Sequence, residues 1–92
     1  MKHLNITVTG KVQGVYYRAT CKAVADQLGI KGFVMNQPDG TVYIEAEGDT
    51  FALEALLEFC HEGPDRAEVA EVRSVEGTFQ GFKNFDVNKK KR

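Results

Sequence analysis

The pattern of apolar and polar residues changes its period near the N-terminus. Leu4, Ile6 and Val8 alternate with polar residues, and this period of two predicts a half-buried strand. Residues 10–17 break the alternation. Over residues 18–28 the spacing becomes that of a helix, with an apolar stripe formed by Cys21, Val24, Ala25 and Leu28. The chain therefore opens with a strand, a loop and a helix.

Two further strands follow, joined by a tight turn. Gly29 is the expected C-terminal cap of the first helix, and residues 31–36 are expected to form the second strand. Pro38-Asp39-Gly40 predicts a turn, because proline presets φ and glycine accepts a positive φ. The third strand is indicated by three alternating inward residues, Val42, Ile44 and Ala46.

A second helix and the last strands complete the pattern. Asp49 or Thr50 can cap this helix. Its apolar stripe consists of Leu53, Leu56, Leu57 and Cys60. Gly63-Pro64 ends it, and a fourth strand is expected over roughly residues 68–76. A short fifth strand is indicated by two alternating residues, Phe85 and Val87.

The order is strand, helix, strand, strand, helix, strand, with one short strand added at the end. It predicts an α+β fold, the ferredoxin-like βαββαβ sandwich, in which a mostly antiparallel sheet carries two helices on one face. Residues 1–92 are expected to form a single domain. Because the first helix carries the chain back across the sheet, the first two strands run the same way. The loop 11–17 and Asn36, which follow these strands, are therefore expected to meet at one edge of the sheet.

The net charge of −1 conceals an asymmetry. Residues 89–92 are all basic, and without them eight basic and thirteen acidic side chains remain, a net charge of about −5. Such an acidic body argues against binding to a nucleic-acid backbone, and the basic tail is expected to be frayed.

Apolar runs of only a few residues exclude a membrane-spanning helix. The N-terminus lacks the apolar segment of a signal peptide, so the cytoplasm is the expected location.

Reactive side chains are few and dispersed. Cys21 and Cys60 fall on apolar helix stripes and are expected to be buried thiols, with no support for a disulfide. His3 and His61 lie far apart in the topology, and His61 is expected to act as a cation or surface group near a helix C-terminus. No cluster has metal-ligand spacing, so no metal is expected. No other cofactor is expected either. Most acidic residues are expected on solvent-facing positions.

The segment from Gly10 to Arg18 is the candidate for chemistry, because it lies between a strand and the start of a helix. Free N–H groups at such a position attract an anion, and Gly10 and Gly14 let the backbone approach a ligand closely. The guanidinium of Arg18 can bind two phosphate oxygens at once. The segment matches neither the P-loop nor the dinucleotide fingerprint. These residues alone are equally consistent with a phosphate or carboxylate cradle and with an ordinary connection carrying a surface arginine.

Three ordered segments resemble the acylphosphatase family. Residues 10–18, Gly-Lys-Val-Gln-Gly-Val-Tyr-Tyr-Arg, are similar to its signature G-[RK]-V-Q-G-V-x-[FY]-R. Residues 32–36 with residues 39–42 resemble its second motif, G-[FYW]-[VA]-x-N-x-x-D-G-x-V. Gly63-Pro64 followed by Ala67 and Val69 resembles its segment after the second helix. The resemblance covers nearly the whole chain, and the family fold agrees with the one expected from periodicity.

The resemblance implies a metal-free enzyme that hydrolyses the carboxyl-phosphate anhydride of acyl phosphates. It makes Arg18 the phosphate-binding arginine and Asn36 the residue that orients the attacking water. The cradle, which would also accept inorganic phosphate or another anion, is completed by the backbone of Gln13, Gly14, Val15, Tyr16 and Tyr17. Tyr16 occupies a position at which the family varies, and Gln37 occupies one at which a smaller residue would be unsurprising. Both residues bear on substrate preference. A monomer is expected, because no broad exposed apolar stripe is apparent.

Other functions of the same fold are alternatives. A metal chaperone would carry a C-x-x-C in the first loop, and this chain has none. Lys31-Gly32-Phe33 resembles the opening of an RNA-recognition motif, but Val34-Met35-Asn36 does not continue it, and the segment lies on the second strand. Domains similar to acylphosphatase also occur within larger carbamoyl-transfer enzymes. An anion pocket used only for sensing would bind without turnover.

Overall fold

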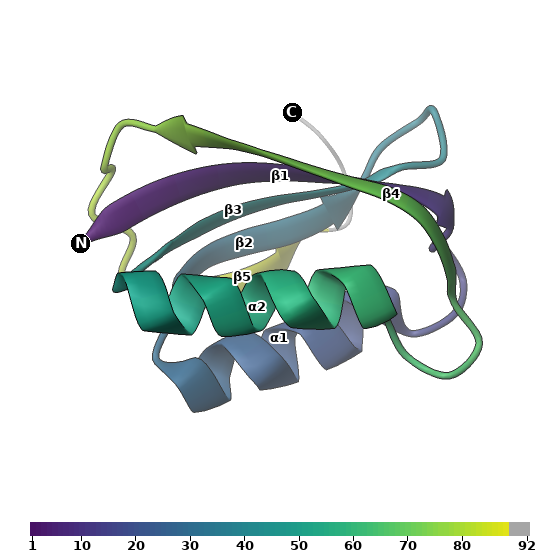
Figure 1. The fold of residues 1–92 in the computed structure, drawn as a ribbon, viewed down its shortest axis with the longest axis horizontal. Coiled ribbons are helices and arrows are strands. Elements are labelled where there is room, and N and C mark those ends of the chain that lie inside the picture. The colour runs from purple at the N-terminus through teal and green to yellow at the C-terminus, as the bar shows by residue number, and fades with distance from the viewer. Residues whose placement is uncertain (89–92) are drawn as a thin grey trace.

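Residues 1–88 of the computed structural model form an open sheet with two helices (Figure 1). The basic tail predicted for residues 89–92 lies outside these described residues. In chain order the elements are β1 (Lys2–Lys11), α1 (Tyr17–Leu28), β2 (Lys31–Asn36), β3 (Val42–Gly48), α2 (Thr50–Glu62), β4 (Glu68–Gly77) and β5 (Phe85–Asn88).

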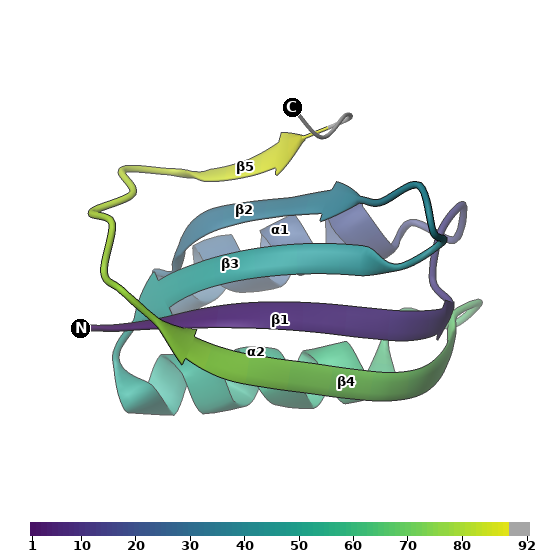
Figure 2. The ribbon, with the colours of Figure 1, turned by 90° about the horizontal axis from the view of Figure 1, so that it is seen from above.

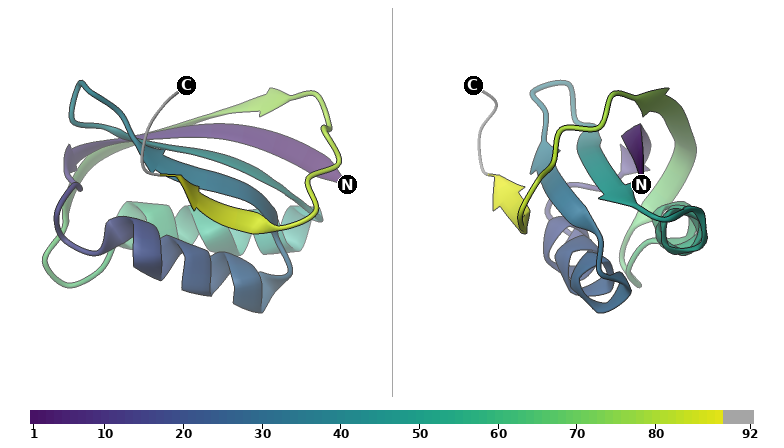
Figure 3. Two further views of the ribbon diagram at one scale, coloured as in Figure 1. Left: turned by 180° about the vertical axis from the view of Figure 1, so that it is seen from behind. Right: turned by 90° about the vertical axis from the view of Figure 1, so that its left-hand side faces the viewer.

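The strands follow the order β4-β1-β3-β2-β5 across the sheet (Figure 2). Neighbouring strands are antiparallel, except that β5 runs parallel to β2. Both helices cover one face of the sheet (Figures 1 and 3). This architecture confirms the predicted α+β, ferredoxin-like fold and the short fifth strand. Neither helix of residues 1–88 is long and apolar enough to cross a membrane.

The core lies between the helices and the alternating residues of the central strands. Ile6 and Val8 of β1 are fully buried, as are Ile44 and Ala46 of β3. The predicted stripes supply the helix side of the core through Cys21, Ala25, Leu53, Leu56 and Cys60. Both cysteines are free and buried, as predicted. Burial raises the pKa of both thiols, to about 12 for Cys60, which is the behaviour of inert core residues.

The observed boundaries differ from the expected ones at the end of β1. The alternation breaks at Gly10, yet β1 continues to Lys11. The reason is a β-bulge between Thr9 and Gly10, which shifts the register of pairing with β4 so that the ladder extends by two residues. At α2, the side chain of Asp49 is the cap and accepts a hydrogen bond from the Ala52 N–H at 2.7 Å.

The topology places two chain segments at the same end of the sheet. β1 and β2 both run antiparallel to β3, which lies between them, so β1 and β2 share a direction. The loop after β1 and the last residue of β2, Asn36, are thus close in space, as predicted. β5 adds its own C-terminal end at this place, because it runs parallel to β2.

Candidate active site

The loop over residues 12–16 ends in an unusual backbone conformation. Tyr16 is the N-cap of α1 and adopts a left-handed conformation with φ 64°, which side chains other than glycine rarely take. Its side chain does not cap the helix. The hydrogen bonds found within residues 1–88 include none donated by the N–H groups of residues 13–17. The turn therefore presents free backbone donors at the positive end of a helix.

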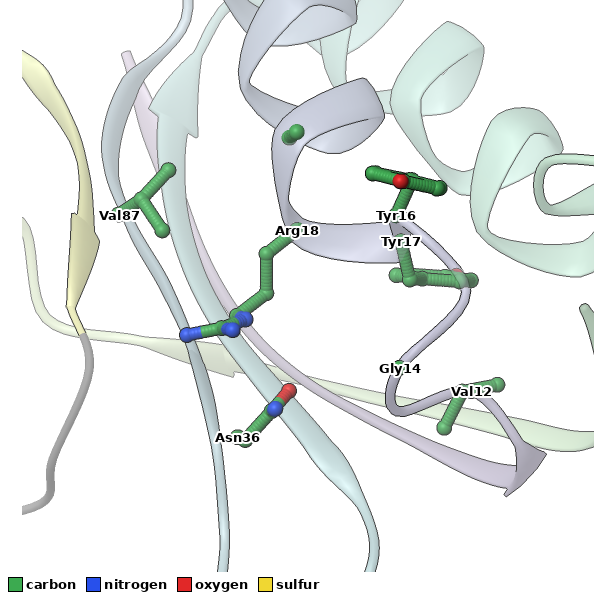
Figure 4. A pocket seen from close by; sticks show the side chains of 8 residues that line it. Val12, Gly14, Tyr16, Tyr17, Arg18, Asn36 and Val87 are labelled. Atoms are coloured by element: carbon green, nitrogen blue, oxygen red, sulfur yellow. The ribbon is translucent and has the colours of Figure 1, made fainter.

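Three residues of this segment, Gly14, Tyr16 and Tyr17, line a cleft of about 420 Å³ (Figure 4). The cleft is lined by the loop between β1 and α1 together with α1, β2 and β5, through Val12, Gly14, Tyr16, Tyr17, Arg18, Ala19, Asn36 and Val87. Its wall is mostly apolar, and its polar groups are the loop backbone, the side chains of Arg18 and Asn36, and the hydroxyl-bearing ring of Tyr16. Such a mixture of a mostly apolar wall with a few convergent polar groups is typical of small-molecule sites.

Arg18 projects from the first turn of α1 toward Asn36 (Figure 4). Its guanidinium is half-buried, and Nη1 donates a long hydrogen bond of 3.4 Å to the carbonyl oxygen of Asn88 at the end of β5. One helical turn later, Nζ of Lys22 donates to the Phe85 carbonyl at 2.8 Å. These two bonds hold β5 against α1. The remaining guanidinium N–H groups of Arg18 can bind an anion in the cleft.

Asn36 ends β2, where its backbone pairs with Val42 of β3. Within residues 1–88, its side-chain Oδ1 is buried and has no hydrogen-bond partner. Leaving a buried acceptor unsatisfied costs about 1–3 kcal/mol, so such atoms in native proteins usually have a ligand or water to bind. In Figure 4 the Asn36 side chain points toward the space bordered by Arg18 and the loop. The cleft therefore contains one unsatisfied acceptor beside a set of cationic and backbone donors.

The predicted site residues come together only in part. Gly14, Tyr16, Tyr17, Arg18 and Asn36 line the same cleft. Gln13 and Val15 are absent from its lining: the Val15 side chain is buried in the core, and that of Gln13 turns toward the β2–β3 turn. The side chain of Tyr17 is also in the core, where its hydroxyl donates to the Cys60 carbonyl at 2.7 Å and burial raises its pKa. The roles of these residues stay predictions.

Sequence reasoning missed the contributions of β5 to the cleft. Val87 lines it, and the Asn88 carbonyl accepts from Arg18. The alternation of Phe85 and Val87 did indicate a strand, but no pattern in the sequence indicated that it would lie beside β2. Apolar Val12 and Ala19, which flank the predicted residues, also line the cleft.

The arrangement of motif, loop and cleft can be compared with known proteins. The family model described as Acylphosphatase matches residues 4–87. The chain belongs to the acylphosphatase family. The predicted family and the predicted enzyme class, acylphosphatase, are thereby confirmed.

Individual acylphosphatases and related structures agree with this assignment. An acylphosphatase of Marinobacter nauticus is 56% identical over 72 residues, which are 78% of each chain. The crystal structure of acylphosphatase from Bacillus subtilis superposes with a TM-score of 0.93 at 32% identity, over 96% of this chain and 99% of that one. HypF of T. kodakarensis matches 99% of this chain with a TM-score of 0.86 at 29% identity, but only 12% of its own length is covered. The same fold thus also occurs within a much longer chain.

No metal-binding group accompanies the cleft in the described part of the chain. Among residues 1–88 no three or more His, Cys, Asp or Glu side chains are placed to hold a metal ion. The polar residues that line this cleft are Tyr16, Arg18 and Asn36, beside the loop backbone.

Proposed function

We propose that this acylphosphatase hydrolyses carboxyl phosphates by direct attack of a water molecule oriented by Asn36. The phosphate is held by the guanidinium of Arg18 and by the backbone N–H groups of residues 13–17. The products are a carboxylate and inorganic phosphate. The observation that carries the proposal is the buried Oδ1 of Asn36, which lacks a partner within residues 1–88 and borders the same cleft as Arg18.

Asn36 is suited to orienting water rather than to removing its proton. The amide of asparagine is not a base at neutral pH, but Oδ1 accepts a hydrogen bond and Nδ2 donates one. An acceptor that is buried and otherwise unused binds one hydrogen of the water. This interaction directs the lone pair of the water toward the phosphorus, and positioning of this kind is the main requirement of phosphoryl transfer.

Arg18 and the loop stabilise the charge of the transferring phosphoryl group. The planar guanidinium fork matches two phosphate oxygens, and the amides at the start of α1 add donors that are fixed by the backbone. Such donors are set in place before the reaction, so no reorganisation is needed as charge shifts. Nη1 of Arg18 donates a long hydrogen bond to the Asn88 carbonyl, and the other guanidinium N–H groups are left to bind the phosphate.

The bond changes need no further protein group. The water oxygen forms a bond to phosphorus while the bond between phosphorus and the acyl oxygen breaks. The carboxylate departs with the electron pair of that bond, and because it is a weak base, no general acid is required. The proton of the attacking water passes to a non-bridging phosphate oxygen of the substrate.

The test is hydrolysis of benzoyl phosphate by the purified protein in the presence of a metal chelator. Turnover that resists the chelator is expected from the parent. Asn36→Ala and Arg18→Ala should each lower kcat/KM by at least about 10²–10³-fold, as is typical for a lost transition-state donor. If the folded parent binds phosphate without turnover, the sensing function replaces the enzyme.

Two matched variants control for the substitutions themselves. Asn84→Ala removes an exposed asparagine side chain from the connection before β5. Arg73→Ala removes an exposed arginine on β4 whose ion pair with Glu71 contributes little. Both are expected to keep parental activity. Circular dichroism of all four variants distinguishes lost chemistry from lost structure.

The proposal includes a monomer that acts in the cytoplasm on a small molecule without a metal, a nucleic acid or a membrane. The net charge of about −5 without the basic tail supports the exclusion of nucleic acid. A monomer is supported by the scatter of the large exposed apolar residues over different elements, namely Met1, Tyr16, Phe51, Val75, Phe79 and Val87. Size-exclusion chromatography tests the monomer, and chelator resistance tests the independence from metal.

A further inference from the structure

The side chain of Gln13 joins two parts of the active site. Gln13 lies in the loop between β1 and α1, and its side chain is half-buried. Its Nε2 donates to the carbonyl oxygen of Gln37 at 2.8 Å and to that of Thr41 at 2.9 Å. Both hydrogens of the amide are therefore used, and both acceptors belong to the backbone of the β2–β3 turn. The phosphate-binding loop is bound to this turn by a single side chain.

The β2–β3 turn is a closed hydrogen-bonded unit, so a displacement of one of its residues also displaces the others. The Gln37 N–H donates to the Thr41 carbonyl at 2.9 Å, and the Gly40 N–H donates to the Gln37 carbonyl at 3.0 Å. Within the same turn, the N–H and hydroxyl of Thr41 both donate to Oδ1 of Asp39. Asn36 directly precedes the turn. A bond to the Gln37 and Thr41 carbonyls therefore acts on the position of Asn36.

The strand order explains why such a link is needed. The cradle and Arg18 follow β1, whereas Asn36 ends β2, and β3 lies between these two strands. No backbone pairing between β1 and β2 sets the distance from the cradle to Asn36. In-line attack nevertheless requires the water and the phosphorus to be aligned closely, and a misplacement of about 1 Å can cost about 10²-fold in rate.

We propose that Gln13 is a positioning residue that sets the cradle and Asn36 at the separation required for in-line attack. This inference rests on the proposed function, because it acts through the water that Asn36 orients. Gln13 was predicted only as a donor of its backbone N–H. The geometry assigns its side chain a second role, which does not involve contact with the substrate.

The test variant is Gln13→Leu, which removes both donors at similar size. It is expected to fold, because the carbonyls of Gln37 and Thr41 each keep one backbone partner. The kcat for benzoyl phosphate should fall about 10–100-fold. The inhibition constant of inorganic phosphate should change by less than about 3-fold, because the loop amides and Arg18 still form one cradle. A loss of loop structure would weaken phosphate binding together with kcat.

A double-mutant cycle identifies the residue through which Gln13 acts. In the Asn36→Ala background, Gln13→Leu should lower kcat by no more than about 2-fold, because the oriented water is already lost. Losses that multiply in the double variant would overturn the positioning role. If Asn36→Ala itself retains parental kcat, the proposed function fails instead, so the two failures are distinguishable.

Two further variants complete the design. Gln80→Leu removes an exposed glutamine amide whose Nε2 donates to the Thr78 carbonyl in the connection between β4 and β5, and it should keep parental kcat within about 2-fold. Gln13→Glu places a carboxylate against two carbonyl oxygens. Its kcat should rise as the pH falls through the pKa of the introduced carboxyl, which becomes a donor when protonated. A pH profile equal to that of Gln13→Leu would contradict the proposal.

Discussion

His3 and Glu47 face each other across β1 and β3 and form a buried pair, with Nδ1 of His3 2.6 Å from Oε2 of Glu47. The two residues are only 3% and 2% exposed. Nε2 of His3 lies 2.9 Å from Oδ1 of Asn5 and 3.2 Å from Oε1 of Glu45. A doubly protonated imidazole satisfies both sides, because each ring nitrogen then carries a donor.

The carboxylate of Glu47 also holds the irregular connection between β4 and β5. It accepts hydrogen bonds from the backbone N–H groups of Gln80, Gly81 and Phe82. This connection runs past the start of β1 and leads into β5 (Figure 2). Acidic residues were mostly expected on solvent-facing positions, and Glu47 is the exception. A charge buried here is tolerated because His3 and three N–H groups compensate it.

The pair predicts that stability is greatest in mildly acidic solution. Burial lowers the pKa of His3, but the hydrogen bonds to Glu47 and Asn5 and the nearby carboxylates outweigh it and raise the pKa above 6.5. Burial raises the pKa of Glu47, but the bonds to Gln80, His3, Phe82 and Gly81 lower it below 4.5. The His3 contribution is complete below pH 6.5 and is lost as the pH rises through the folded-state pKa. The Glu47 contribution is complete above pH 4.5 and is lost on acidification.

Urea unfolding of the parent should therefore give a free energy of unfolding that decreases as the pH rises above 6.5. His3→Gln should abolish this contribution to the slope and lower the stability at pH 6 by roughly 1–3 kcal/mol. The matched control is His61→Gln, which changes an exposed histidine in the last turn of α2 and should leave the slope intact. An unchanged slope in His3→Gln would contradict the role of the pair.

Local patterns predicted the elements of the fold well, but not their distant partners. Residues 31–36 form a strand with the expected bounds, and Gly29 and Gly63 end the helices as expected. These features depend on near neighbours. The extension of β1 to Lys11 depends on a bulge against β4, and the place of β5 depends on a connection held by Glu47. Neither feature has a periodic signal in the sequence.

The candidate site shows the same difference between local features, which the sequence predicts, and features that depend on distant residues, which it does not. The residues of the loop were compatible with either an anion cradle or an ordinary connection, and the family resemblance decided between them. The left-handed backbone of Tyr16 and the unsatisfied Oδ1 of Asn36 could not be predicted, because both depend on the folded surroundings. The bonds of the Gln13 side chain join residues 24 and 28 positions apart, a separation that no local pattern encodes.

Tyr17 is expected to contribute to stability through its side chain. Its hydroxyl donates to the Cys60 carbonyl in the last turn of α2, where helix carbonyls lack intrahelical partners. Tyr17→Phe should lower the free energy of unfolding by about 1–3 kcal/mol, because a buried acceptor loses its donor. Tyr43→Phe, which removes a half-buried hydrogen bond to Glu45, is the matched control and should cost less than about 1 kcal/mol. Equal losses in urea unfolding would argue against this contribution.

Tyr16 is expected to influence the choice of acyl group. Tyr16 is 77% exposed and lines the cleft. In-line attack places the acyl group on the side of the phosphate away from Asn36, and in Figure 4 the Tyr16 ring lies across the cleft from Asn36. Tyr16→Asn keeps a residue that accepts the left-handed conformation but removes the ring. The ratio of kcat/KM for benzoyl phosphate to that for acetyl phosphate should fall about 3- to 10-fold. An unchanged ratio would exclude contact between the ring and the acyl group.

Arg18→Lys separates the charge of the arginine from its shape. Lysine keeps one positive charge but has no planar fork, so it cannot bind two phosphate oxygens in parallel while donating to the Asn88 carbonyl. We expect kcat/KM for benzoyl phosphate to fall about 10²-fold, and inhibition by inorganic phosphate to weaken with it, because the same fork binds both. Lys22→Arg, one turn further along α1, is the matched exchange of one cation for another and should leave both quantities near the parental values. If Arg18→Lys retained parental kcat/KM, charge alone would be sufficient, and bidentate binding of the phosphate would be wrong.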